Sequence, residues 1–453
     1  MVDLTYLKSI GLVLLVVVTA VVVVHADGDG DDEGVHWAVL VAGSNTYDNY
    51  RHQADICHAY HIVRKNGIPD DRIIVMMYDD IAHNPLNPFQ GNIINQPNGT
   101  NLYPGVPKDY TKQEVRPEVF TKILTGDEEG LEKIIGRKGK VLKSGPKDYV
   151  FINFADHGGP GVFLFPHDGL YSDDFHKAVL EMHEKKMYKQ MLFYVEACES
   201  GSMFFNFTQL SEINVFATTS ASPDEPSHGC YYDDVRKTFL GDVYSVNWMQ
   251  DSDKENLKKE TLAQQFKLVK SKTWGFSHVS EYGDLNISKK PVADFLGTLN
   301  SDSNSKPYHF HSGSTAPDPR LDAVPAEKVK EEILLRKIAQ LTGDEREQHK
   351  TELGKLWQIK KATEEFFRFI VGDVIQESLF EHFVKQPIKL SDFPCYKQSV
   401  KLIMRLCPGL DVPQNYYAVR KLRVLANLCD STISAEQIWR SIGQVASRSK
   451  ICA

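Results

Sequence analysis

Short apolar runs alternate with amphipathic stretches over the first 220 or so residues of the chain. The apolar runs are rich in β-branched and aromatic residues, which is typical of buried strands, and the stretches between them have helical spacing. This alternation predicts an α/β fold with a mostly parallel sheet flanked by helices. Strands are expected at 36–42, 72–78, 149–154, 190–195 and 214–219, and helices at 51–66 and 174–185.

The pattern changes near residue 290. Residues 300–325 are polar and rich in Ser, Pro and Gly, which predicts an exposed linker. After it only helical patterns remain, at 326–340, over a long region at 344–385, and in the tail at 395–452. The predicted organisation is a catalytic α/β domain at 35–299, a linker at 300–325 and an all-helical domain at 326–453.

The N-terminus has the features of a secretory signal peptide. Lys8 precedes an apolar run at 10–24, and Val24 and Ala26 are the small residues of a cleavage site. We therefore assign 1–26 to a signal peptide and 27–34 to an acidic lead. A membrane anchor is the alternative, but the run is short for a span, and no later apolar run reaches about 18 residues. Three glycosylation sequons agree with secretion, at Asn98, Asn206 and Asn286.

Composition and charge exclude one class of partner. Hydrophobic residues make up 42% of the chain and charged residues 25%, as in an ordinary globular protein. The net charge is -8 and no basic run stands out, which argues against nucleic-acid binding.

The seven cysteines fall into two groups. Four of them, Cys395, Cys407, Cys429 and Cys452, crowd the C-terminal tail, where an oxidising route favours disulfides, and spacing alone leaves three pairings open. The odd number upstream, Cys57, Cys198 and Cys230, leaves at least one free thiol.

Two predicted strands end in polar, glycine-rich turns that suit covalent catalysis. The strand at 149–154 leads into His157 and Gly158, and the strand at 190–195 leads into Cys198. Carboxyl ends of parallel strands meet at one edge of the sheet, where α/β folds hold their ligands. A histidine there can ionise the thiol and later protonate a leaving amine. The backbone N–H groups of Gly158 and Cys198 can stabilise an oxyanion.

A purely structural interpretation of these residues is a core cysteine and a turn histidine, the usual fate of a free cysteine. The two turns occurring together favour the catalytic interpretation. Neither Cys57, within a helical pattern, nor Cys230, in a tyrosine-rich loop, has such a setting, and we predict structural roles for both.

The motifs around these residues resemble the legumain (asparaginyl endopeptidase) family over nearly all of the chain after the signal peptide. The matching segments are VAGSN (41–45), NYRHQAD (49–55), VPKDYT (106–111), DHGGPG (156–161), EACESGSM (196–203) and FLGDVYSVNW (239–248). The resemblance implies a caspase-like fold, with Cys198 as nucleophile and His157 as general base. It further implies that Asn49 orients the imidazole and that Asp156 modulates the reaction.

The resemblance also implies a substrate pocket formed by Arg51, His52, Glu196 and Asp242. Such a pocket suits asparagine, because a guanidinium donates to the amide carbonyl and a carboxylate accepts from the amide NH2. An ionised aspartate would meet carboxylates, so we expect cleavage after Asn, with cleavage after Asp appearing as the pH falls. Pro226 stands where family members often have Ser, and Ser227 is the substitute we consider.

The helical domain resembles the legumain prodomain, which implies an intramolecular inhibitor and the pairings Cys395–Cys429 and Cys407–Cys452. An independent binding domain is the alternative. We predict autocatalytic activation at Asn300 or Asn304 in acid, which also weakens carboxylate pairs across the interface. Gln340 occupies a position where related proteins often place Asn, and the hypothesis is that it plugs the cleft.

The expected partners are peptides and proteins with exposed Asn, the chain's own prodomain, and cystatin-type inhibitors. We expect no cofactor and no metal, and we expect the protein in the secretory pathway, in a lysosome, endosome or vacuole, or in an acidic digestive lumen. Two alternatives share the motifs: a peptide ligase or transpeptidase, and a catalytically silent binding protein. A glycolipid-anchor transamidase subunit would need a C-terminal apolar span, which the sequence lacks.

Overall fold

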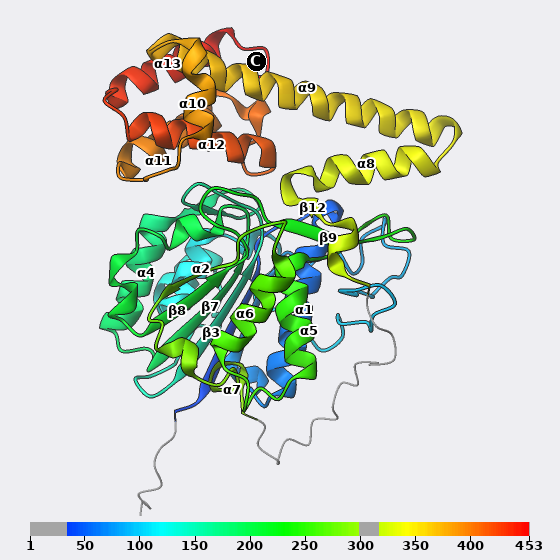
Figure 1. Cartoon of the computed structure of the whole chain (residues 1–453), viewed down its shortest axis with the longest axis vertical. Coiled ribbons are helices and arrows are strands. Elements are labelled where there is room, and N and C mark those ends of the chain that lie inside the picture. The colour runs from blue at the N-terminus through cyan, green and yellow to red at the C-terminus, as the bar shows by residue number, and fades with distance from the viewer. Residues whose placement is uncertain (1–33, 299–316, 453) are drawn as a thin grey trace, which may run out of the picture. The chain divides into compact units, whose positions relative to one another are not determined.

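A computed structural model describes residues 34–298 and 317–452 of the 453-residue chain. Six strands form the central sheet in the order β11-β8-β7-β3-β1-β2, and all are parallel except β11, which runs antiparallel to β8 (Figure 1). The predicted strands are confirmed to within a residue or two at each end. The sheet comprises β1 (His36–Ala42), β2 (Ile73–Met77), β3 (Tyr149–Ala155), β7 (Gln190–Glu196), β8 (Val215–Thr219) and β11 (Ser280–Gly283).

Both faces of the sheet are covered by helices, because successive strand residues point to opposite sides. In β1, for example, Leu40 belongs to one apolar core and Val41 to the other. One face packs against α1 (Tyr50–Lys65), α5 (Val243–Lys254), α6 (Leu262–Thr273) and α7 (Ala293–Leu296). The other packs against α2 (Pro117–Leu124), α3 (Glu128–Ile135) and α4 (Ser172–Glu184).

Two small antiparallel sheets, which the sequence analysis did not predict, lie beside this layer. One has the order β4-β5-β6 and the other β10-β9-β12. Their strands are β4 (Gly158–Gly159), β5 (Val162–Leu164), β6 (Gly169–Tyr171), β9 (His228–Asp233), β10 (Thr238–Asp242) and β12 (Val324–Pro325). The last of these corrects the prediction that all of 300–325 is an exposed linker, since β12 pairs with β9.

The C-terminal domain is helical, as predicted, although the long region at 344–385 is broken. Its second helix ends at Val374, and a new one begins at Phe380 after a turn of 3-10 helix. The helices are α8 (Val329–Gln340), α9 (Gly343–Val374), α10 (Phe380–Lys385), α11 (Phe393–Leu406), α12 (Tyr416–Cys429) and α13 (Ala435–Arg448). Disulfides join Cys395 to Cys429 and Cys407 to Cys452. None of the helices in the described part of the chain combines the length and the apolar composition that a membrane crossing requires.

Candidate active site

The histidine and the cysteine lie at the ends of neighbouring parallel strands. Ala155 at the end of β3 pairs with Glu196 at the end of β7, so His157 and Cys198 each follow two residues after this last pair. A Cβ atom on Gly158 would lie 2.4 Å from the Cys198 carbonyl oxygen, so only glycine fits there. The sheet register therefore places the His157–Gly158 turn against the backbone of Cys198.

Asn49 sets the tautomer of the imidazole. His157 Nε2 lies 2.8 Å from Asn49 Oδ1, an acceptor, so this nitrogen carries the proton and donates it. His157 Nδ1 has no hydrogen-bond partner among the described residues. That leaves the Nδ1 lone pair as the base, and Asn49 itself is held by a bond from its Nδ2 to the Asn45 carbonyl, at 2.9 Å.

Burial favours the neutral forms of the thiol and of the imidazole. Cys198 is buried, and burial, followed by the nearby carboxylates of Glu199 and Glu327, raises the pKa of its thiol. Burial and the neighbouring Arg51 guanidinium hold the pKa of His157 well below its usual range. Since the thiolate is the nucleophile, both shifts disfavour the reactive form of the pair.

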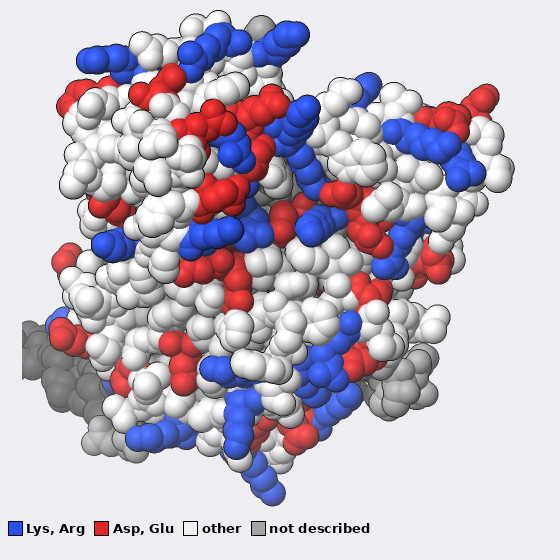
Figure 2. Space-filling view, turned by 45° about the horizontal axis from the view of Figure 1, so that its top comes forward, with Lys and Arg blue, Asp and Glu red and all other residues white. Residues whose placement is uncertain are grey.

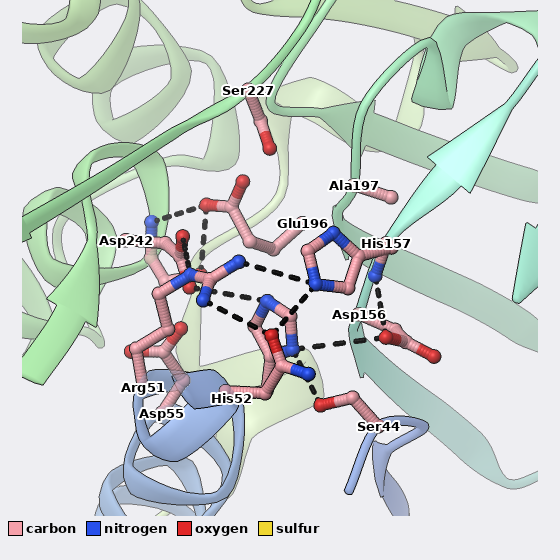
Figure 3. Close-up of polar contacts among 12 residues, drawn as sticks. Ser44, Arg51, His52, Asp55, Asp156, His157, Glu196, Ala197, Ser227 and Asp242 are labelled. Atoms are coloured by element: carbon pink, nitrogen blue, oxygen red, sulfur yellow. Dashed lines mark hydrogen bonds and ion pairs between the residues drawn. The ribbon is translucent and has the colours of Figure 1, made fainter. Parts of the chain in front are cut away.

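The predicted pocket residues come together beside this pair (Figure 3). Arg51 Nε donates to Asp242 Oδ1 at 2.9 Å, and both side chains are buried. Glu196 Oε2 accepts from the backbone N–H and the hydroxyl of Ser245, each at 3.1 Å. Ser227 Oγ lies 3.9 Å from Cys198 Sγ, so Ser227 does line the site next to Pro226. One cation and two acids are thus buried together beside the catalytic pair.

His52 lies between two acids: its Nδ1 is 3.7 Å from Asp156 Oδ1, and its Nε2 is 3.7 Å from Asp242 Oδ2. His52 Nδ1 is 2.7 Å from Ser44 Oγ, and its ring meets that of His157 edge to face. Asp156 Oδ1 accepts the His157 backbone N–H at 2.5 Å. His52, Asp156 and His157 could offer a metal three ligand atoms within 4.8 Å, but the first two already use such atoms in hydrogen bonds.

Helix α12 of the C-terminal domain covers the site. The ring of Tyr416 stacks on that of His157, with centroids 3.3 Å apart and planes 13° from parallel. Asn49 Nδ2 donates to the Tyr416 hydroxyl at 2.7 Å. One turn later, Arg420 donates to Glu199 Oε1 at 3.0 Å and to Glu327 Oε1 at 2.7 Å. No sequence signal singled out Tyr416 or Arg420, because neither belongs to a catalytic motif.

The segment ahead of α8 runs along the edge of β9. Val324 pairs with Gly229 and Pro325 with His228, antiparallel, and the Ala326 N–H donates to the Ser227 carbonyl at 2.9 Å. This is how an extended peptide adds to a sheet edge. Residues 324–326 therefore lie along β9 as far as Ser227, whose Oγ is 3.9 Å from Cys198 Sγ.

Gln340 does not lie in the cleft, so the predicted plug is wrong. It is exposed at the end of α8, where its Nε2 donates to Asp234 at 2.6 Å and its Oε1 accepts from Lys237. Both partners lie in the turn between β9 and β10. Helix α8 leads away from the cleft, and position 340 is at its far end.

A second contact region joins α11 to α4. Lys397 Nζ lies 2.9 Å from Asp173 Oδ1 and 2.5 Å from Asp174 Oδ2, and the Tyr396 hydroxyl donates to the Pro160 carbonyl at 2.8 Å. Burial opposes the effect, but the hydrogen bonds from Lys397 leave the pKa of Asp174 lower than usual. This carboxylate weakens the contact only when the pH falls below its ordinary pKa of about 3.8.

The remaining predicted sites are placed as follows. Asn98, Asn206 and Asn286 are all exposed, and the Asn206 side-chain amide donates to the Lys389 carbonyl in the C-terminal domain. Asn300 and Asn304, like the signal peptide, lie outside the described residues. On the face in Figure 2, acidic and basic side chains are interspersed, in keeping with a chain that has no basic run.

Comparison with known proteins gives the same picture at the level of the whole chain. Residues 36–298 match the Peptidase C13 family, and residues 348–446 match the legumain prodomain. The chain is 44% identical to legumain of Homo sapiens over 92% of this chain and 94% of that protein. It is 36% identical to the vacuolar-processing enzyme beta-isozyme of Arabidopsis thaliana, over 91% and 86% respectively.

Among solved structures, caspase-1 from Spodoptera frugiperda aligns with a TM-score of 0.34 and 9% identity, covering 59% of this chain and 92% of that one. The family follows from the sequence matches, which span both the α/β domain and the helical domain. The chain belongs to the peptidase C13 family, as a legumain-type cysteine peptidase followed by its own prodomain.

Proposed function

We propose that this chain is the zymogen of a cysteine endopeptidase that cleaves peptide bonds after asparagine through an acyl-enzyme on Cys198. The observation that carries the proposal is the bond from His157 Nε2 to Asn49 Oδ1. This bond leaves the basic Nδ1 of the same ring without a partner among the described residues. The ring follows β3, and the Cys198 thiol follows the neighbouring strand β7.

The chemistry follows from these positions. His157 Nδ1 takes the proton of the Cys198 thiol, and the thiolate attacks the substrate carbonyl carbon. The backbone N–H groups of Gly158 and Cys198 stabilise the resulting oxyanion, each worth roughly 3 kcal/mol of barrier. The imidazolium then protonates the leaving amine, and water, deprotonated by the same nitrogen, hydrolyses the thioester.

The pocket selects asparagine by matching its two polar groups. Arg51 donates to the carboxamide oxygen, and Glu196 or Asp242 accepts from its NH2. Burial, and then the neighbouring Asp242 charge, raises the pKa of Glu196 to about 8. Glu196 is therefore mostly protonated at pH 7 and below, and in this form it does not repel an aspartate side chain.

The rate of cleavage after Asp is accordingly expected to rise as the pH falls from 7 to 4, while cleavage after Asn persists throughout. The sign follows because the substrate carboxylate loses its charge in this direction, whereas Glu196, whose pKa is about 8, is already mostly protonated at pH 7. Matched Asn and Asp peptides, assayed with the activated enzyme over this range, provide the measurement. Equal rates for the two peptides at every pH would rule out the pocket assignment.

We further propose that residues 324–326 keep the zymogen latent by imitating a substrate. Their pairing with β9 runs up to Ala326, whose N–H bonds to Ser227 beside Cys198. Alanine at this position leaves the polar groups of the pocket unmatched, so the bond after it is cut poorly. Activation then proceeds at Asn300 or Asn304 once acid has loosened the prodomain.

Replacing Ala326 by asparagine is expected to make the zymogen cut itself after residue 326. The carboxamide would give the pocket its preferred group on a segment already aligned beside the thiol. Mass spectrometry of fragments formed at pH 4 to 7 would show the new cut, whereas fragments of the unaltered chain end after Asn300 or Asn304. The control is Gln340→Asn, which adds an exposed asparagine away from the thiol. A chain cut readily after residue 340 but not after 326 would contradict the proposal.

The proposed partners are proteins with accessible asparagine residues, together with cystatin-type inhibitors of the opened cleft. The proposed location is an acidic compartment of the secretory pathway, and one relative is named for vacuolar processing. Such a compartment suits a zymogen that opens in acid.

A further inference from the structure

A third buried acid lies behind the pocket, and the proposed mechanism does not use it. Asp55, on α1 one turn after Arg51, is buried next to Asp242 (Figure 3). Its Oδ1 accepts a hydrogen bond from Asn95 Nδ2 at 2.7 Å. Asn95 in turn lies 2.9 Å from His58 Nδ1, through its Oδ1.

Within the described part of the chain, each of the three acids of this cluster keeps one oxygen that has no N–H or O–H donor within hydrogen-bond distance. These oxygens are Asp55 Oδ2, Asp242 Oδ2 and Glu196 Oε1, and all three residues are buried. A buried carboxylate oxygen without a donor is costly. Protons retained on the carboxyl groups themselves remove this cost.

The charge count leads to the same conclusion. Arg51 is the cation that contacts the cluster, through Asp242, and it cannot neutralise three carboxylates. The other titratable groups near Asp55 are the Cys57 and Cys230 thiols, whose pKa values burial raises, and His58, which bonds to Asp253. His52 faces Asp242, with Nε2 3.7 Å from Oδ2, and burial, followed by Arg51, holds the pKa of His52 well below its usual range, which favours the neutral ring. Asp55 and Asp242 are close enough to influence each other's protonation, and two adjacent buried carboxyl groups beside one guanidinium are more stable when one of them carries a proton.

We propose that Asp55 is a positioning residue for substrate specificity, sharing a proton with Asp242 and so setting how pocket charge changes with pH. With no proton bound, the pair of carboxyl groups has two negative charges. With one proton it has one negative charge, and with two protons it is neutral. Each proton gained makes the pocket more tolerant of a substrate aspartate. This inference rests on the proposed pocket, and it assigns Asp55 no contact with the substrate.

The acids of the pair are poised to titrate above their ordinary range. Burial, and then the charges of Asp242 and Glu196, raises the pKa of Asp55, and burial raises that of Asp242 in spite of Arg51. Protons therefore enter the pair at a higher pH than they would enter two exposed aspartates. Discrimination between Asn and Asp is expected to change as they enter.

The test is Asp55→Asn in the activated enzyme, assayed with matched Asn and Asp peptides from pH 4.5 to 7.5. The new amide donates to Asp242 and holds it ionised, so the pair no longer gains or loses protons. The measured quantity is the ratio of kcat/KM for the Asp peptide to kcat/KM for the Asn peptide. Over this pH range we expect the change in the ratio to be roughly tenfold smaller than in the unaltered enzyme, because one titrating proton changes a rate about tenfold per pH unit. Superimposable curves, or equal losses for both peptides with an unchanged pH profile, would overturn the inference.

Two further variants complete the experiment. Asp251→Asn alters another buried acid, which accepts from Gln265 Nε2 at 2.9 Å, and should leave the ratio unchanged at every pH. If Asp55→Asn does not fold, Asn95→Ala removes the N–H donated to Asp55 and should move the change in the ratio to higher pH; no movement overturns the inference. If the unaltered enzyme does not cleave after Asn, the proposed function itself is wrong.

Discussion

Replacing Cys198 by alanine is expected to abolish peptide cleavage, lowering kcat by roughly six orders of magnitude. Removal of the nucleophile has an effect of this size in peptidases whose catalytic groups act as a unit. The residual rate would come from the oxyanion donors and from substrate binding, which the substitution leaves in place. His157→Ala should cost nearly as much, because without a base the thiol stays protonated.

The measurement needs chains from which the prodomain has been removed, and a Cys198→Ala chain cannot remove its own. A trace of active enzyme added at acidic pH, and then withdrawn by an affinity tag, would cut the linker in trans. Cys57→Ala provides the control, since it removes another buried free thiol, one that lies inside α1. It should lower stability by about 1 kcal/mol and leave kcat unchanged. Activity surviving in the Cys198→Ala enzyme would end the catalytic assignment.

Asn49→Ala is expected to lower kcat by less than Cys198→Ala but by more than Cys57→Ala. The amide orients the imidazole but transfers no proton, so its loss costs roughly 10⁴-fold or less in kcat.

Features that depend on interactions between residues near one another in the sequence could be predicted from the sequence. The strands were predictable because alternation and β-branching act locally, and β1 was placed to the residue. The site followed from one general rule, that carboxyl ends of parallel strands share an edge. The motifs around His157 and Cys198, together with this rule, were enough to predict that the two residues lie close together.

Interactions between distant segments could not be predicted in this way. Gln340 was placed in the cleft because its neighbours resemble a prodomain helix, but the direction in which that helix runs depends on packing against the β9–β10 turn. Tyr416 lies 259 positions after His157, and nothing in its own neighbourhood indicates a stacking partner. The pairing of Val324 with Gly229 is likewise invisible in a polar, proline-containing segment.

The effect of acid on the prodomain also depends on these distant contacts, and it differs from the expectation that paired carboxylates trigger release. Burial raises the pKa of Glu199 to about 7, against the influence of Arg420. Glu199 thus gains a proton in the closed form as the pH falls through 7, whereas an exposed glutamate gains one near 4.5. Between these values Glu199 favours the closed form and opposes release.

The imidazole of His157 acts in the opposite direction. In the closed form its pKa lies well below 6.5, because Tyr416 and the surrounding residues exclude water from it. When the prodomain leaves, the ring regains water and its pKa returns toward 6.5. The open form then binds one proton more, so closure weakens by up to 1.36 kcal/mol for each pH unit below 6.5. Between 6.5 and 4.5 Glu199 offsets this effect, and below 4.5 it no longer does so, because it is then protonated in both forms.

Replacing Tyr416 by alanine is therefore expected to raise the pH at which the prodomain opens by at least about two units. The substitution removes a buried aromatic ring and its hydrogen bond from Asn49, a loss of roughly 3 kcal/mol. Divided by 1.36 kcal/mol per pH unit, this loss is equivalent to about two units. Hydrogen exchange of the amides at 158–164, corrected for the intrinsic pH dependence and measured in a Cys198→Ala background to prevent self-cleavage, would report opening. The control is Tyr417→Ala, because Tyr417 bonds to Glu364 within the prodomain and not to the catalytic domain. Equal midpoints for the two variants would show that the stack on His157 does not hold the zymogen closed.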